Sequence, residues 1–272
     1  MKMLVTIRQK FQFWTGLFIL SLIVLAAIFS PAIAKFDPND QNDPITNGYQ
    51  EPNSKHWFGT DKFGRDIFSR VLFGSRVSLL ITISVVLLST IFGSIYGAAS
   101  GYFGGIIDQG LMRLVDLFLS FPIVFLAVTC LALFSSGIFT LIIILSLTSW
   151  MDIARLVRAE VHSLKQHLFI LKAKAVGLST GRIILFHLLP NVFAIIIVFS
   201  IIRMADIILL ESALSYIGLG TQPPTPSWGS IISDGKEVLG SAWWITFFPG
   251  LAILLTTISL NFIGNGIKSR QE

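Results

Sequence analysis

Few side chains in this sequence stand where they could do chemistry. The four histidines, His56, His162, His167 and His187, show no metal-ligand spacing, and the single cysteine, Cys130, lies in an apolar run. No G-x-x-x-x-G-K-[ST] motif occurs, so the chain is not expected to bind and hydrolyse ATP through a P-loop. We therefore expect no catalytic residue, no metal site and no cofactor in this chain.

Three ionisable residues lie within or at the end of one apolar run: Arg203, Asp206 and Glu211. Such groups are costly at membrane depth and usually face a cavity or a partner. Arg203 and Asp206 are three residues apart, which is close enough for them to pair on a helix. Two interpretations stay open. The pair neutralises itself or bridges to a partner subunit, or these residues line a translocation path.

The composition indicates that most of the chain is embedded in lipid. Hydrophobic residues make up 53% of its 272 residues and charged residues 13%, whereas soluble domains carry about 25% charged residues. The mean hydropathy is +0.77. Runs long enough to cross a bilayer occupy residues 13–34, 78–99, 117–134, 137–151, 188–210 and 243–264. The sequence thus predicts an all-α polytopic membrane protein with six transmembrane helices.

The first apolar run imitates a signal peptide, because it follows the basic start MKMLVTIRQK and ends in PAIAK. We expect an uncleaved span instead, since the run is longer than the apolar core of a signal peptide and Pro31 lies close to the would-be cleavage point. Residues 1–36 are therefore assigned to a cytoplasmic tail and first span, 37–77 to an extracellular loop, and 78–272 to a core of five helices.

The distribution of Lys and Arg indicates the orientation, because cytoplasmic loops hold the excess of these residues. With the N-terminus inside, the start, the 100–116 turn, the 152–187 segment and the tail all carry basic residues. The 35–76 loop balances its basic residues with acidic ones, and the 211–242 loop holds a single lysine. Both termini are predicted to be cytoplasmic. The net charge of +5 thus reflects topology, and no nucleic-acid partner is expected.

The basic segment contains the stretch FILKAKAVGLSTGRIILFHLLPN at residues 169–191, which favours a helix–turn–helix element. Five apolar side chains recur at helical spacing: Leu164, Leu168, Leu171, Ala175 and Leu178. Gly177 permits a break or a close approach, and Ser179 could cap a second helix that runs towards Pro190. The element either rests on anionic headgroups or docks its apolar face into a groove of a cytoplasmic partner.

The same stretch resembles the cytoplasmic loop of permease subunits in binding-protein-dependent ABC importers, whose usual pattern is E-A-A-x-x-x-G followed by I and L-P. The matching residues are Ala173, Ala175, Gly177, Ile183, His187 and Pro190. Three further stretches resemble the C-type permease subunit of dipeptide, oligopeptide and nickel importers: FGTDKFGRDIFSRVLFGSRVSL at 58–79, LMRLVDLFLSFP at 111–122 and LSYIGLGTQPPTPSWGSII at 214–232. The resemblance covers nearly the whole chain.

This resemblance implies a type I ABC importer permease fold, MetI-like, in a bacterial inner membrane. The implied partners are a homologous B-type permease, two ATPase subunits that bind ATP and magnesium, and an extracellular substrate-binding protein. It also implies that the 152–187 loop sits in a cleft of an ATPase subunit and transmits its closure to spans that rock to alternate access. The implied coupling residues are Leu171, Lys172, Ala173, Ala175, Gly177, His187 and Pro190.

The sequence departs from the family pattern at two of these positions. Counting back from Gly177, Leu171 and Lys172 stand where Glu and Ala are usual, so no carboxylate is assigned there. Peptide-importing relatives usually carry small apolar residues around positions 203–206, whereas nickel and metal-chelate importers tolerate polar ones. The expected cargo is therefore nickel or a metal chelate, or a short peptide, and the polar pair favours a metal or metallophore. The other function classes are a membrane-embedded enzyme and a non-conducting scaffold subunit.

The two outer segments are expected to be structural. Asp61, Arg65, Asp66 and Arg70 are spaced to form local ion pairs, in a rigid cap or in contact with the binding protein. The glycines and prolines of residues 218–229 favour a stiff loop that only surrounding protein makes tolerable. Three tryptophans in and after this loop are expected at the outer membrane interface: Trp228, Trp243 and Trp244.

Overall fold

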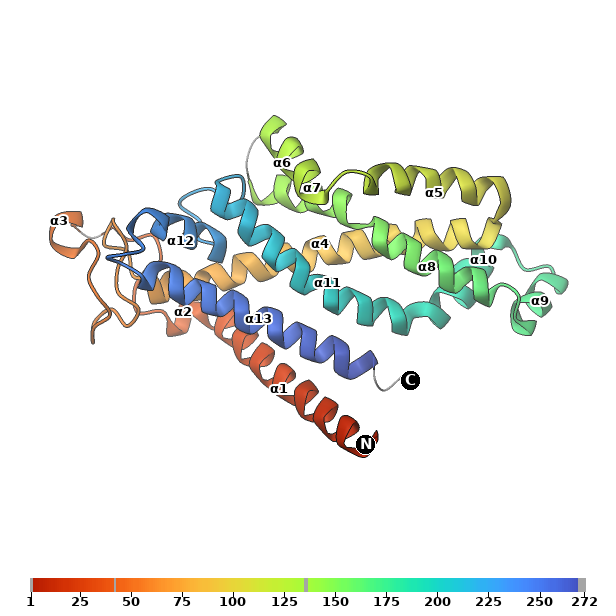
Figure 1. The fold of residues 1–272 in the computed structure, drawn as a ribbon, viewed down its shortest axis with the longest axis horizontal. Coiled ribbons are helices and arrows are strands. Elements are labelled where there is room, and N and C mark those ends of the chain that lie inside the picture. Colours follow the sequence, from red (N-terminus) through yellow and green to blue (C-terminus); the bar gives the residue numbers. More distant parts are fainter. Residues whose placement is uncertain (1, 42, 135–136, 269–272) are drawn as a thin grey trace.

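A computed structural model describes the backbone of residues 2–41, 43–134 and 137–268, and within these ranges it shows helices and connecting turns without a strand. The longer helices form an elongated bundle (Figure 1) and are α1 Lys2–Ile28, α4 Ile67–Phe103, α5 Gly105–Leu119, α6 Ile123–Leu133, α7 Ile138–Ser149, α8 Met151–Leu164, α11 Leu189–Ile217 and α13 Trp244–Lys268. Among the described residues, five helices are long and apolar enough to cross a membrane, or six if the bent pair α5 and α6 is one span. The predicted all-α polytopic fold is confirmed.

The short helices lie at the two ends of this bundle. One end, on the left of Figure 1, holds α2 Ser30–Ile33, α3 Pro44–Asn47, α12 Trp228–Gly235 and the 3₁₀ turn η2 Lys236–Val238. The opposite end, on the right, holds α9 Leu168–Ala175, α10 Thr180–Ile183 and the π-helical turn η1 Ile184–Leu188. We call the first the cap end and the second the loop end.

Helix α4 is longer than the predicted span 78–99, because it begins at Ile67 and runs to Phe103. Asp66 caps it, since its Oδ2 accepts a hydrogen bond from the backbone N–H of Ser69 at 2.8 Å. The first turns are buried by protein, with Ile67 0% exposed. Residues 67–77 therefore belong to a helix and not to the predicted 37–77 loop. The prediction looked for apolar runs that could cross a bilayer, and the first turns of α4 are polar enough to escape it because protein, not lipid, covers them.

The predicted third span, 117–134, straddles a sharp bend. Helices α5 and α6 meet at 79° across Ser120–Pro122. Pro122 has no backbone N–H to continue the helical ladder, and its ring disfavours the helical conformation at the residue before it. The apolar run is thus divided between the end of α5 and the whole of α6.

The predicted fourth span, 137–151, is too short. Helices α7 and α8 together form a candidate span over Ile138–Leu164. Helix α8 packs along α4 and buries Ile153, Val157 and Val161, each at most 1% exposed. Charged residues occupy its other face, which lowers the average hydropathy and conceals the buried stripe. The predicted cytoplasmic segment 152–187 therefore begins inside the bundle.

Three glycines of α4 allow α8 to approach so closely. Gly93, Gly97 and Gly101 recur every fourth residue, and a Cβ added at any of them would lie 2.2–2.6 Å from a backbone oxygen of Trp150, Ala154 or Arg158. No side chain fits at those distances. Small residues at this spacing are typical of close helix pairs in membranes, where packing drives association.

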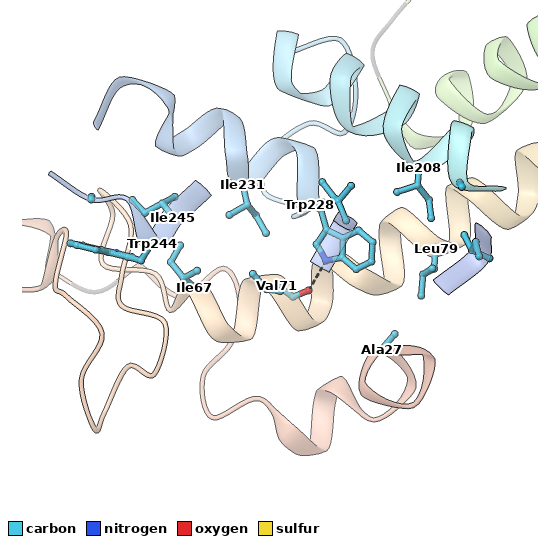
Figure 2. Close-up of a cluster of buried hydrophobic side chains, with 13 residues drawn as sticks. Ala27, Ile67, Val71, Leu79, Ile208, Trp228, Ile231, Trp244 and Ile245 are labelled. Carbon is cyan, nitrogen blue, oxygen red and sulfur yellow. Dashed lines mark hydrogen bonds between the residues drawn. The ribbon is translucent and has the colours of Figure 1, made fainter. Parts of the chain in front are cut away.

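Two tryptophans form the core of the cap end (Figure 2). Trp228 and Trp244 are 1% and 2% exposed, and their indole N–H groups donate to the backbone oxygens of Val71 at 3.2 Å and Thr60 at 3.1 Å. The two indoles therefore serve the protein core, because each N–H finds its acceptor inside the protein. Their place at the outer membrane interface stays a prediction. Trp243 remains 50% exposed.

Candidate functional site

The loop end carries the predicted helix–turn–helix element. Helix α9 ends in a Schellman motif, in which Leu178 N–H donates to Ala173 C=O at 3.2 Å and Gly177 N–H donates to Lys174 C=O at 2.9 Å. Gly177 adopts φ +80°, a left-handed conformation that glycine takes without a Cβ penalty. Ser179 occupies the N-cap position of α10 without a side-chain capping bond. The glycine of the family pattern is thus the residue that reverses the chain.

One face of α9 packs on this chain and the other is open. Ile170 and Ala173 are buried in a cluster with residues of α4, α8 and α11. On the predicted apolar face, Leu168 is 74% and Leu171 48% exposed, and Ala175 is exposed as well, while the neighbouring Val176 is 81% exposed. The exposure of Leu168, Leu171 and Ala175 is compatible with both predicted placements of this face, on lipid headgroups or in a groove of a partner. Their exposure leaves an apolar surface uncovered by this chain.

The surface of the loop end carries positive charge. No Asp or Glu occurs between Glu160 and Asp206, whereas lysines and arginine recur through α9 and α10. Lys172 is exposed beside Leu171, and Lys174 Nζ lies 4.8 Å from the ring centroid of Tyr102. At the two positions where the family pattern has Glu and Ala, the surface therefore presents an apolar side chain and a cation.

The turn continues directly into a bundle helix. After α10 the hydrogen bonding shifts to a π-helical turn, where Leu189 N–H donates to Ile184 C=O. Pro190 lies in the first turn of α11 and has no N–H to donate to the carbonyl of Phe186, four residues earlier. Beside it, Asn191 Nδ2 donates to His187 C=O at 2.6 Å. The helix nevertheless continues over Thr180–Ile217. The element at the loop end is thus rigidly joined to α11.

The predicted pair of Arg203 and Asp206 forms on α11, with Arg203 Nη1 3.2 Å from Asp206 Oδ2. Arg203 Nη2 also contacts Asp152 Oδ2 of α8, a partner that sequence reasoning missed. The side chains of Arg203, Asp152 and Asp206 are 21%, 33% and 57% exposed. Arg203 therefore ties α11 to α8, and Asp206 is the member that faces outward. That they line a path stays a prediction.

Glu211 is separate from this pair. It is 0% exposed, and its carboxylate accepts hydrogen bonds from Ser78 Oγ of α4 at 3.2 Å and Ser215 Oγ at 2.8 Å. In this conformation it has no surface from which to line a pathway. The sequence reasoning grouped it with Arg203 and Asp206 because all three share one helix, and a single sequence does not show which side of a long helix is covered by protein.

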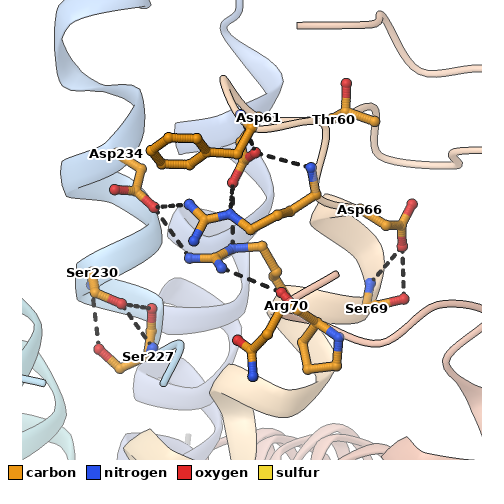
Figure 3. Close-up of polar contacts among 12 residues, drawn as sticks. Thr60, Asp61, Asp66, Ser69, Arg70, Ser227, Ser230 and Asp234 are labelled. Atoms are coloured by element: carbon orange, nitrogen blue, oxygen red, sulfur yellow. Dashed lines mark hydrogen bonds and ion pairs between the residues drawn. The ribbon is translucent and has the colours of Figure 1, made fainter. Parts of the chain in front are cut away.

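The cap end is held by a buried ionic cluster (Figure 3). Arg65 Nε donates to Asp61 Oδ2 at 2.6 Å, and the guanidinium groups of Arg65 and Arg70 both reach Asp234 Oδ2 of α12, at 3.0 and 3.1 Å. Asp66 pairs with His56 at 2.9 Å. Asp61 thus forms the predicted local ion pairs, with Arg65 and, at 3.7 Å, with Arg70, whereas Asp66 takes His56 as its partner. Asp234 adds a link across the fold that the local spacing did not reveal.

The chain matches the models of two protein families. The model described as "Binding-protein-dependent transport system inner membrane component" matches residues 89–272. A second model, "N-terminal TM domain of oligopeptide transport permease C", matches residues 8–52.

Curated relatives agree with these matches. The chain is 39% identical to the dipeptide transport system permease protein DppC of Alkalihalophilus pseudofirmus, covering 93% of this chain and 83% of that protein. It is 36% identical to the oligopeptide transport system permease protein OppC of Bacillus subtilis, covering 93% and 82%. These names refer to peptides and not to a metal, so the expected nickel or metal-chelate cargo finds no support in them.

A solved structure shows the same fold. A chain of the MetNI methionine ABC transporter, in inward-facing conformations, superposes with a TM-score of 0.59 at 16% identity, over 74% of this chain and 95% of that one. This likeness shows a MetI-like architecture, as the sequence motifs had implied. The chain belongs to the family of binding-protein-dependent transport system inner membrane components, and it is a permease subunit of an ABC importer.

Proposed function

We propose that this chain and a homologous second permease form the membrane pathway through which an ABC importer takes up short peptides. The support for peptides as cargo is the identity of 39% and 36% to permeases named for dipeptides and oligopeptides, over 93% of the chain. A binding protein outside the cell delivers the cargo. ATP and magnesium are bound by two separate ATPase subunits, and this chain carries out no catalysis of its own.

The single observation that carries a coupling role is the geometry of the loop end. The exposed Leu168, Leu171 and Val176 lie on a short helix that leads through one turn into α11. A force applied to α9 by an ATPase subunit is therefore passed to a helix that crosses the bundle. An apolar helix face of this kind is a standard way for a helix to dock into a groove.

The proposal includes a location and an orientation. We place the chain in a bacterial inner membrane with both termini and the loop end in the cytoplasm, and the cap end outside. The basic residues of α9 and α10 support this orientation, because cytoplasmic segments hold the excess of Lys and Arg. The cap end then faces the binding protein.

Growth on peptides tests the cargo. In a host strain that needs one amino acid, deletion of this chain should abolish growth when that amino acid is supplied only in a dipeptide or tripeptide, while growth on the free amino acid continues. Re-expression of the chain should restore growth. Unchanged growth on peptides, together with loss of nickel accumulation, would contradict the proposal.

A further inference from the structure

Glu211 is a buried acidic residue that forms no ion pair with any residue that the structure describes. It lies in a candidate membrane span and is 0% exposed. Within the described ranges, each other buried acidic side chain has a basic partner: Asp61 has Arg65, Asp66 has His56 and Asp108 has Arg158. Ionisable groups at such depth are rare and are commonly functional. Among the described residues, serine hydroxyls bind the oxygens of Glu211: those of Ser78, Ser212 and Ser215. Ser78 and Ser215 lead on to one segment.

That segment is residues 218–235, which comprise the loop after α11 and helix α12 and are called the cap segment here. Ser78 Oγ donates to Glu211 Oε2 and accepts the backbone N–H of Trp228 at 3.2 Å. Ser215 Oγ donates to Glu211 Oε1 and accepts the backbone N–H of Thr221 at 3.4 Å. Two serines thus connect one carboxylate to two backbone amides of the cap segment.

The direction of these hydrogen bonds gives Glu211 its effect. A serine hydroxyl has one proton and two lone pairs. Because the carboxylate takes the proton of Ser78 and of Ser215, the lone pairs of both oxygens are left for the N–H groups of Trp228 and Thr221. Trp228 begins α12, and the first N–H groups of a helix have no acceptor within it.

The cap segment packs so closely on α11 that two of its glycines have no room for a side chain. A Cβ added at Gly229 would lie 2.5 Å from the backbone oxygen of Ser212, and one added at Gly220 would lie 1.9 Å from Ser215 Oγ. The cap segment therefore lies directly on the serine-bearing face of α11. Its other end is fixed by Asp234, which binds Arg65 and Arg70.

We propose that Glu211 is a positioning residue that fixes the cap segment to α4 and α11, so that movement of α11 moves the cap segment with it. This inference rests on the proposed function for its role in transport, because α11 is the helix that begins at the loop end. The fixing of the cap segment is testable without that function.

Hydrogen exchange of the purified transporter complex tests the fixing. Glu211→Leu removes the carboxyl group at similar volume, and exchange at the amides of Thr221 and Trp228 should rise together, by about tenfold for the loss of one hydrogen bond each. Ser78→Ala should expose Trp228 alone, and Ser215→Ala should expose Thr221 alone. Glu211→Gln keeps an acceptor and a donor for the two serines and should retain most of the protection.

Ser233→Ala is the matched control. Ser233 Oγ donates to Tyr216 C=O at 2.8 Å and so joins the same two elements, but this hydrogen bond is exposed and does not involve Glu211. It should leave both amides protected. Equal exchange in Glu211→Leu and the wild type would overturn the inference, as would a Glu211→Gln protein that exchanges like Glu211→Leu.

The role in transport has a separate readout. In proteoliposomes, the ratio of binding-protein-stimulated to basal ATPase activity should fall in Glu211→Leu and recover in Glu211→Gln, whereas Ser233→Ala keeps the wild-type ratio. A wild-type complex that takes up no peptide would refute the proposed function and leave the exchange result standing. A normal ratio in Glu211→Leu, with raised exchange, would refute only the role in transport.

Discussion

Some candidate functional side chains of this protein join two helices, and others are exposed on the surface of one helix. Arg203 lies 21% exposed between Asp152 and Asp206, so its first effect is to hold α8 against α11. Leu171 and Lys172 have no such internal role, because both side chains are exposed on α9. Position 171, where the family pattern usually has Glu, is therefore on the surface of α9, and the fold does not depend on which residue stands there.

Substitution of the Arg203 cluster distinguishes its two interpretations. Asp206→Ala should have a small effect, because Asp206 is 57% exposed. Asp152→Ala and Arg203→Ala should each lower stability by about 1–2 kcal/mol, a typical upper range for interhelical polar contacts in membranes. If the pair only joins helices, the double variant of Arg203 and Asp152 should recover transport. Continued loss of peptide uptake in a normally assembled double variant would show that the cluster contacts cargo.

At the scale of elements, helix packing here is set by small residues and by breaks. The sequence predicts helices wherever the chain is apolar, but it does not distinguish an apolar surface that faces lipid from one that faces protein. Helix α8 was missed as a packed element because Arg155, Arg158 and Glu160 lower its hydropathy, although its apolar stripe and the glycines of α4 are complementary. Pro122 was visible as a break signal inside the predicted third span.

The glycine contact makes a prediction about stability. Gly97→Ala should destabilise the protein by about 1–3 kcal/mol, the usual cost of overpacking, because its new Cβ would lie 2.2 Å from Ala154 O. Gly110→Ala on α5 is the matched control, since a Cβ there meets nothing within 4 Å. It should be neutral or slightly stabilising. Thermal unfolding in detergent measures both, and equal melting temperatures would contradict the close α4–α8 packing.

The turn after α9 makes a second prediction at this scale. A Cβ at Gly177 meets nothing in this chain, so Gly177→Asp should insert normally and cost only the strain of φ +80°, about 1–2 kcal/mol. Against an ATPase subunit the added carboxylate should still uncouple hydrolysis from transport. Gly177→Asn has the size of Asp and also tolerates the left-handed conformation, so it separates the added charge from the added bulk. Normal peptide uptake by Gly177→Asp would remove the docking assignment.

At the scale of the whole molecule, the two ends have different constructions. The cap end is closed by buried charges and tryptophans, whereas the loop end leaves apolar and basic side chains open. The sequence predicted the ion pairs of the cap end and the helix–turn–helix of the loop end, because both are patterns within a short stretch of chain. Asp234 with Arg65, and Glu211 with Ser78, join residues more than a hundred positions apart, and such contacts do not follow from the spacing in a single sequence.

Labelling with an impermeant thiol reagent tests the orientation, in a variant whose native Cys130 is replaced by serine. Ile45→Cys at the cap end is on α3, where Ile45 is 93% exposed, and Gln166→Cys lies in the exposed turn after α8. The cap site should react from outside the cell only and the loop site from the cytoplasmic side only. Reaction of both cysteines from the same side would contradict the proposed topology.

The central claim is that this chain is a coupled part of a peptide pathway and not a separate enzyme or scaffold. The most direct measurement is uptake of a labelled dipeptide into proteoliposomes that contain this chain, the second permease and the two ATPases, with loaded binding protein outside and ATP inside. The account predicts accumulation that requires both ATP and this chain, and no ATP hydrolysis by the chain purified alone. Full ATP-driven accumulation without this chain, or ATP hydrolysis by the chain alone, would contradict it.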